Sequence, residues 1–168
     1  MLIQQNVDGS NFFHRPWAEF KVGFGDPSGN YWLGNDLLSQ LTLTGRYKLR
    51  FDLQSRSNPG NWYNAEYSTF RVLPETDNYR VVVTDFSGNA TDAFAWYHNG
   101  MMFTTHDRDN DPQSGNCATV TRGGFWHNTC FRCGVTVSNT RPAPWRFIWH
   151  RLPGGWDLQT SRMWLECK

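Results

Sequence analysis

The sequence has no run of about 18 apolar residues, the length a helix needs to cross a membrane. Its first six residues, Met1 to Asn6, lack the apolar segment of a signal peptide. The net charge is only +1, which gives no basic surface of the kind that binds nucleic acid. Nucleophile-elbow, His-Glu-x-x-His and phosphate-loop motifs are missing too. We therefore expect no enzyme, no nucleic-acid partner and no membrane span.

Cysteine is missing from the first 116 residues, and all four cysteines, Cys117, Cys130, Cys133 and Cys167, fall in the last third. Four cysteines allow three pairings. The Cys130–Cys133 spacing also occurs in zinc and redox sites, but zinc knuckles usually pair two close-spaced couples, and the other two cysteines stand alone. Disulfides are favoured over zinc or free thiols.

Charged residues are scarce at 18%, whereas aromatic residues reach 16%, with nine Trp and twelve Phe. A chain of 168 residues is long enough for one domain with a real core. Packing of that core is the ordinary use of so many rings. An aromatic-lined pocket for a sugar or acyl group is the alternative.

Local patterns predict short helices followed by a sheet. Helices are expected over 16–23 and 36–42, with Asn35 as the N-cap of the second. Strands are expected at 47–54, 65–72, 79–85, 146–150 and 162–167, and the short turns between the earlier ones favour antiparallel pairing. Residues 100–145 are irregular and rich in rings and cysteines, so we place the functional surface there.

Three carboxylates stand at alternate positions in Asp107, Asp109 and Asp111. Alternating carboxylates in a turn can surround a cation with hard oxygen ligands. The loop is not an EF-hand, because Pro112 and Ala118 occupy the positions that would need Gly and Glu. By spacing alone, a calcium site and a solvated acidic turn are equally good interpretations.

Several segments resemble a fibrinogen C-terminal-like domain, and they keep the order and spacing of that family. They are Phe24-Gly25-Asp26, Tyr31-Trp32-Leu33-Gly34-Asn35-Asp36, Tyr67-Ser68-Thr69-Phe70-Arg71-Val72, His98-Asn99-Gly100-Met101-Met102-Phe103-Thr104-Thr105, Asp107-Arg108-Asp109-Asn110-Asp111, Gly115-Asn116-Cys117-Ala118, Gly123-Gly124-Phe125-Trp126 and Cys130. The similarity covers nearly the whole chain to Cys130 and is looser beyond it.

The resemblance implies an α+β fold: a twisted, mostly antiparallel central sheet with short flanking helices and an irregular region that binds calcium and ligand. It implies Ca²⁺ held by the side chains of Asp109 and Asp111 and the backbone carbonyls of Gln113 and Gly115. Asp107 then resembles a supporting residue. The family pattern also implies a Cys117–Cys130 disulfide and a cis peptide bond between Thr129 and Cys130.

The chain departs from the family in several places. We expect a single domain over 1–168 that appears truncated at its N-terminus and shortened after Cys130. Lectin-like members carry His directly after that cysteine, where this chain has Phe131. Cys133 and Cys167 are extra to the pattern, and we expect them to pair with each other.

Two functions follow from the resemblance, both non-catalytic, extracellular and secreted. The leading hypothesis is a calcium-supported lectin of innate defence that binds acetylated carbohydrates or other surface ligands. Its ligand contacts would come from Phe125, Trp126, His127, Thr129, Cys130 and Phe131. The alternative is a protein–protein module of the tenascin or angiopoietin type, acting in matrix adhesion or receptor signalling, and the departure at Phe131 favours it. We expect the full-length protein to be capable of forming oligomers.

Overall fold

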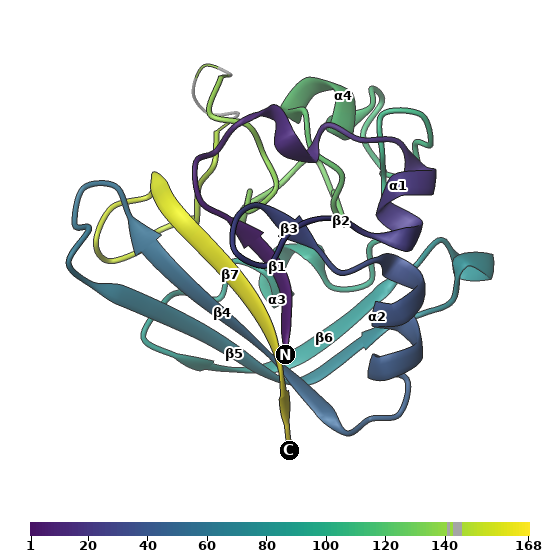
Figure 1. The fold of residues 1–168 in the computed structure, drawn as a ribbon, viewed down its shortest axis with the longest axis horizontal. Coiled ribbons are helices and arrows are strands. Elements are labelled where there is room, and N and C mark those ends of the chain that lie inside the picture. Colours follow the sequence, from purple (N-terminus) through teal and green to yellow (C-terminus); the bar gives the residue numbers. More distant parts are fainter. Residues whose placement is uncertain (141, 143–145) are drawn as a thin grey trace.

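A seven-stranded sheet forms the framework of the computed structural model, which describes residues 1–140, 142 and 146–168 (Figure 1). The strand order is β2-β3-β1-β7-β4-β5-β6, and every neighbouring pair is antiparallel. The strands are β1 (Leu2–Asn6), β2 (Phe24–Gly25), β3 (Tyr31–Trp32), β4 (Tyr47–Ser55), β5 (Trp62–Val72), β6 (Val81–Gly88) and β7 (Leu158–Cys167). The α+β prediction and the antiparallel sheet are confirmed.

The helices are short. They are α1 (Trp17–Val22), α2 (Asn35–Thr42), α3 (Ala95–His98) and α4 (Cys117–Thr121), with 3-10 turns at Asn11–Phe13 and Glu75–Asp77. Both early helices were predicted, but Asn35 does not cap α2. Gly34 occupies the cap position, and the buried side chain of Asn35 accepts a hydrogen bond from the Trp32 indole at 2.9 Å.

Most predicted strands are present. In β4 the alternation buries Leu49, Phe51 and Leu53 completely, as a half-buried strand requires. The expected strand at 146–150 is wrong: Trp149 and Ile148 form only isolated bridges there, and the chain turns at Arg151, whose φ is 56°. Burial of Phe147 and Trp149 in the core produces the strand-like alternation without a ladder.

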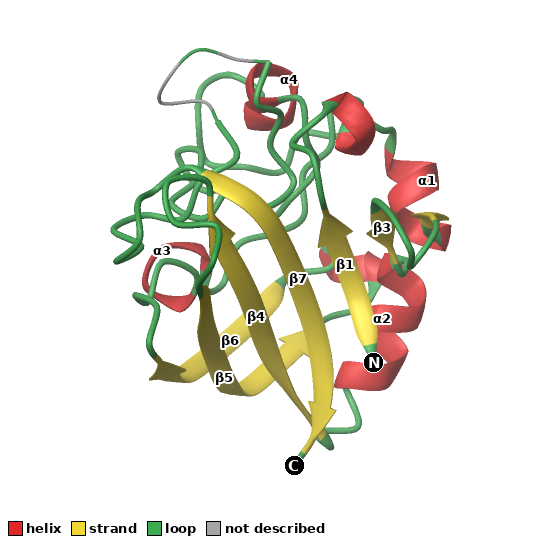
Figure 2. Cartoon of the chain, turned by 60° about the vertical axis from the view of Figure 1, so that its left-hand side comes forward, coloured by secondary structure: helices red, strands yellow, loops and turns green. Residues whose placement is uncertain are grey.

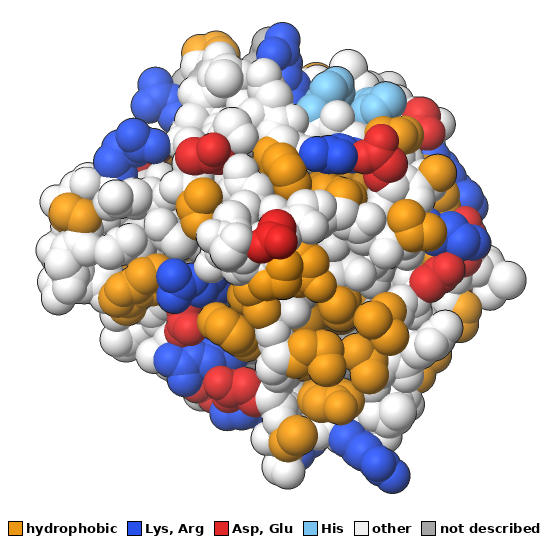
Figure 3. All heavy atoms as spheres, in the orientation of Figure 1, with side chains coloured by type: hydrophobic (Ala, Val, Ile, Leu, Met, Phe, Trp, Pro, Cys, Tyr) orange, Lys and Arg blue, Asp and Glu red, His pale blue; other side chains and the backbone are white. Residues whose placement is uncertain are grey.

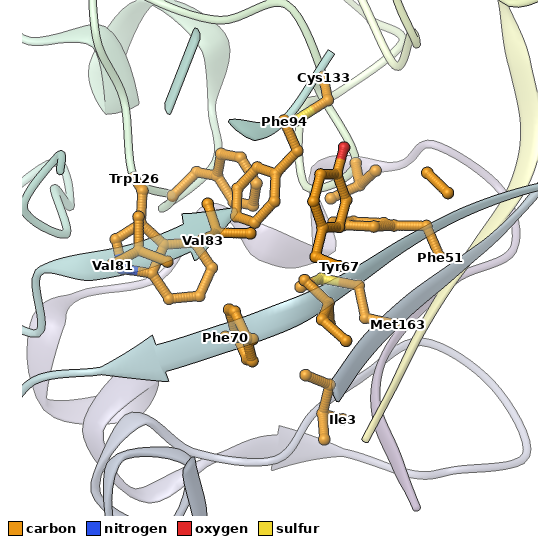
Figure 4. Packing of buried hydrophobic residues seen from close by; sticks show 14 of the residues in the cluster. Ile3, Phe51, Tyr67, Phe70, Val81, Val83, Phe94, Trp126, Cys133 and Met163 are labelled. Carbon is orange, nitrogen blue, oxygen red and sulfur yellow. The ribbon is translucent and has the colours of Figure 1, made fainter. Parts of the chain in front are cut away.

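Aromatic rings fill the space between the sheet and the irregular segments (Figure 4). Trp126 packs among these rings, with its ring centroid 5.2 Å from that of Phe103 and 5.3 Å from that of Phe125. Trp32 and Trp149 are also fully buried. The high aromatic content therefore serves mainly to build the core.

The irregular segments gather with α4 above one end of the sheet, while α2 lies against the sheet at the other end (Figure 2). On the face drawn in Figure 3, acidic and basic side chains are interspersed, with no large field of one sign. No helix in the described part of the chain is long and apolar enough to cross a bilayer.

Candidate functional site

The acidic loop, residues 107–117, is held in place by hydrogen bonds from Asn110 within it and Asn116 near its end. Asn110 donates from its backbone to the Thr104 hydroxyl at 3.0 Å and from its side chain to the Phe103 carbonyl at 2.9 Å. At the far end, Asn116 donates to the Thr105 carbonyl at 3.0 Å and accepts from the Thr119 backbone at 3.1 Å, which caps α4. These bonds fix the loop against residues 103–105 and against the start of α4.

Asp107 supports the fold next to this loop. One carboxylate oxygen accepts hydrogen bonds from the Trp17 backbone at 2.9 Å and from the Thr105 hydroxyl at 2.7 Å. Trp17 is the first residue of α1, so Asp107 satisfies one of the free donors at that helix end. Asp107 therefore anchors α1 beside the loop, and its role in supporting a calcium site stays a prediction.

Asp109 and Asp111 lie close together in the loop. Asp109 accepts from the backbone of Asp111 at 3.2 Å, and Asp111 accepts from Gln113 at 3.0 Å and Cys117 at 3.0 Å. Burial raises the pKa of Asp111 to about 6, and the negative charge of Asp109 contributes to that shift. The fold thus concentrates two carboxylates where a positive charge would relieve their repulsion.

An open groove of about 300 Å³ lies beside Asp111. Its wall consists of Arg80, Gly100, Met101, Met102, Asn110, Asp111 and Pro112. The Arg80 guanidinium is already engaged, since it bonds Asp77 at 3.0 Å and the Gly100 carbonyl at 2.9 Å.

Cys117 and Cys130 form a disulfide that joins the start of α4 to the turn after residue 128. The peptide bond between Thr129 and Cys130 is cis. Both features were implied by the family resemblance and both are present.

The predicted pairing of Cys133 with Cys167 is wrong, because both are free thiols. Cys133 is fully buried, and its backbone forms an isolated β-bridge with Trp149. Cys167 is exposed at the end of β7, where its backbone lies opposite Tyr47 of β4. Cys133 is held in the core and Cys167 at the end of β7, so the fold does not bring the two thiols together.

Most of the expected ligand contacts are inside the protein. Phe125, Trp126 and His127 have no exposed surface, and Cys130 and Phe131 keep only 3% and 6%. The Trp126 indole donates to the Tyr79 carbonyl at 2.7 Å, and His127 donates to the Gly123 carbonyl at 2.8 Å. These side chains belong to the core, so none of the three presents its ring to solvent, and their assignment as ligand contacts stays a prediction.

Thr129 is the one exposed member of that predicted set. The Tyr97 hydroxyl lies 3.0 Å from the Thr129 carbonyl and 2.5 Å from its hydroxyl. The exposed Arg132 places its guanidinium 5.0 Å from the Tyr97 ring centroid. Tyr97 and Arg132 are not among the candidate surface residues predicted from the sequence. For Tyr97 a signal was available, because it directly precedes the family segment that begins at His98.

The buried side chain of His98 hydrogen-bonds the backbone on both sides of the turn at Thr129. Its Nδ1 donates to the Trp126 carbonyl at 2.8 Å, and its Nε2 accepts from the Arg132 backbone at 3.1 Å. Burial lowers the pKa of His98 to about 3, and burial lowers that of His127 to about 4. Both imidazoles are neutral structural groups at neutral pH.

The sequence was compared with models of known protein families. Residues 1–163 match the family described as the C-terminal globular domain of fibrinogen beta and gamma chains. The chain belongs to the fibrinogen C-terminal domain family. The predicted resemblance is therefore confirmed.

Among curated fibrinogen-related proteins, mouse angiopoietin-related protein 1 is 46% identical over 98% of this chain and 34% of its own length. Human angiopoietin-related protein 2 is 45% identical over 77% of the chain and 26% of its own length. Human ficolin-3 is 41% identical over 80% of the chain and 44% of its own length. The chain thus spans less than half the length of each of these three relatives.

Solved fibrinogen-like structures share the fold. The fibrinogen-like globe domain of human ANGPTL2 gives a TM-score of 0.86 at 37% identity, covering 99% of this chain and 79% of that one. Lamprey fibrin D-dimer, solved with the peptide Gly-His-Arg-Pro-amide, gives 0.86 at 30% identity over 98% of this chain and 60% of its own.

Proposed function

We propose that this fibrinogen-related chain is an extracellular, secreted recognition domain that binds a protein partner, with calcium fixing the loop at 107–117. The observation that carries the proposal is the burial of Phe125, Trp126 and His127. Rings withdrawn into the core cannot wall an acetyl pocket. An open surface at Thr129, Tyr97 and Arg132 suits protein recognition better than capture of a small ligand.

The donor set of the acidic loop fits calcium. Ca²⁺ takes six to eight oxygen ligands from carboxylates, backbone carbonyls and water. Asp109 and Asp111 supply carboxylate oxygens, and Gln113 and Gly115 are exposed residues of the same turn. Within the described residues, neither of their carbonyls accepts a backbone hydrogen bond.

Bound calcium would neutralise the two carboxylates and tie the loop to the disulfide-linked α4. Asp111 already bonds the backbone of Cys117, the first residue of that helix. The chain itself therefore couples the loop to the turn at Thr129 through the Cys117–Cys130 bond.

A lectin function is the second candidate. The hydroxyls of Tyr97 and Thr129 lie at the exposed surface of the turn, where they could bond a sugar. The similarity to ficolin-3 favours this reading as well.

A paired experiment separates these functions. Thermal unfolding of the oxidised protein is measured with calcium and with a chelator, and Asp109→Asn serves as the variant. Retention is then compared on N-acetylglucosamine and glucose matrices and on an array of purified extracellular ectodomains.

Calcium stabilisation with selective ectodomain binding and no acetyl preference supports the proposal. A calcium-dependent acetyl preference that Asp109→Asn removes would transfer the assignment to a lectin. An unfolding temperature that calcium leaves unchanged would refute the metal assignment.

A further inference from the structure

A row of exposed and half-exposed rings lies beside the Thr129 turn, next to two arginines that form no ion pair within the described residues. We call it the Trp96–Trp156 surface and define it by Trp96, Tyr97, Arg132, His150, Arg151 and Trp156. These residues come from three separate segments: α3, the chain after the disulfide, and the turn before β7. Only the tertiary fold places them together.

The rings form one continuous row. Trp96 stacks on His150 with a centroid separation of 5.8 Å and an interplanar angle of 23°, and His150 contacts Trp156 at 4.8 Å. Trp96 also contacts Tyr97 at 5.8 Å. Trp96 keeps 62% of its surface exposed and Trp156 keeps 50%, so both indoles protrude instead of filling the core.

The surface carries two positive charges that no carboxylate of the described residues neutralises by an ion pair. Arg132 and Arg151 are exposed, and within the described part of the chain neither has a carboxylate within 4.0 Å. Both guanidinium groups act on His150, whose pKa is lowered by burial and then by these two charges. Nearby Arg146, in contrast, is paired with Asp157 at 3.8 Å.

The backbone beneath the surface is held in place. His150 donates from its backbone to the Arg132 carbonyl at 2.9 Å, and its own carbonyl accepts from the Thr91 hydroxyl at 2.5 Å. Tyr97 bonds Thr129, and His98 bonds the Arg132 backbone. A platform ordered in advance loses little conformational entropy when a partner binds.

We infer that the Trp96–Trp156 surface binds an acidic segment of a protein partner. The inference rests on the proposed recognition function and deepens it by naming the partner's chemistry. Trp, Tyr and Arg are the residues that most often dominate binding energy at protein interfaces. Free guanidinium groups pair with carboxylates through charge-assisted hydrogen bonds, and protruding indoles give the anchoring apolar contact.

The test uses short fluorescein-labelled peptides of Glu, Tyr and Gly, and an analogue with Gln in place of Glu. Fluorescence anisotropy is measured against the oxidised chain with calcium present. The Glu peptide should bind at least tenfold more tightly than the Gln peptide, and added NaCl should weaken its binding.

Matched variants locate the contact. The double variant Arg132→Gln/Arg151→Gln and the single variant Trp96→Ser should each reduce affinity at least tenfold. Arg46→Gln, just before β4, and Trp62→Ser, at the start of β5, change exposed residues outside this surface and should leave affinity unchanged. The unfolding midpoint of every variant is recorded, so that loss of binding is separated from loss of fold.

Equal binding of the two peptides, or equal loss in the Arg46→Gln control, would overturn the inference. Tighter binding of heparin or single-stranded DNA than of the Glu peptide would also overturn it, because the partner would then be another polyanion. If the peptide test fails while the wild type and the double variant bind the same ectodomains with calcium, the recognition function stands and this surface is not its contact.

Discussion

Replacing Trp126 with Phe should destabilise the domain strongly, because this ring belongs to the core and not to a ligand pocket. Trp126 has no exposed surface, and its indole N–H donates to the carbonyl of Tyr79, a residue that is also fully buried. Phe keeps a ring at the same place but cannot donate. The substitution therefore tests burial and hydrogen bonding together.

The expected loss has two parts. Leaving a buried carbonyl without its donor costs about 1–3 kcal/mol. Removing the atoms by which indole exceeds phenyl costs roughly 1–2 kcal/mol more, since one buried CH₂ is worth about 0.8 kcal/mol. The free energy of unfolding should fall by about 2–5 kcal/mol.

Urea unfolding measures this change directly. With a slope of about 2 kcal/mol per molar urea, the midpoint should fall by roughly 1–2.5 M. Trp96→Phe is the matched control: Trp96 is 62% exposed, so its stability should change by less than about 0.5 kcal/mol.

A Trp126→Phe variant as stable as the wild type would refute the assignment of this ring to the core. So would a larger loss for Trp96→Phe than for Trp126→Phe. Both variants should keep the slope of the wild type, because a changed slope would mean that the unfolding reaction itself had changed.

Calcium near 1 mM should stabilise the domain by about 1.4 kcal/mol if its dissociation constant is ~10⁻⁴ M, and calorimetry should show that Asp109→Asn removes this gain. The folded-state pKa of His98, about 3, lies below its ordinary value of 6.5, so its contribution to stability is complete above pH 6.5 and is lost as the pH falls toward 3. The free energy of unfolding of His98→Gln, measured with urea, should depend less on pH over that range, by up to about 1.4 kcal/mol per pH unit. A pH dependence equal to that of the wild type would contradict this role. Replacing Cys117 and Cys130 with Ala should cost about 3 kcal/mol, because the bond closes a loop with a sequence separation of 13, whereas Cys167→Ser should be neutral in the same urea assay.

Local patterning was enough to predict the sheet and the first helices. The alternation in β4 and the apolar face of α1 express periodicities that do not depend on distant contacts. The same reasoning failed at residues 146–150, where Phe147 and Trp149 alternate because they enter the core from an irregular segment.

The acidic loop could be located from sequence because the proposed calcium ligands are close together along the chain. Asp109 and Asp111 belong to one turn, so spacing and family resemblance together define the candidate donors. The Trp96–Trp156 surface offered no such signal. Its rings and arginines come from distant segments, and their exposure depends on how the core is filled.

The amino-acid sequence by itself determined the family, the antiparallel framework, the acidic loop and the Cys117–Cys130 bond. Only the tertiary structure decided which aromatic rings are buried and which face solvent. It buried Trp126 in the core and left Trp96 exposed on α3, although both are tryptophans in ring-rich stretches of the sequence. The physical reason is that burial depends on the neighbours that packing supplies, and those neighbours are not encoded in the residue's own type or local spacing.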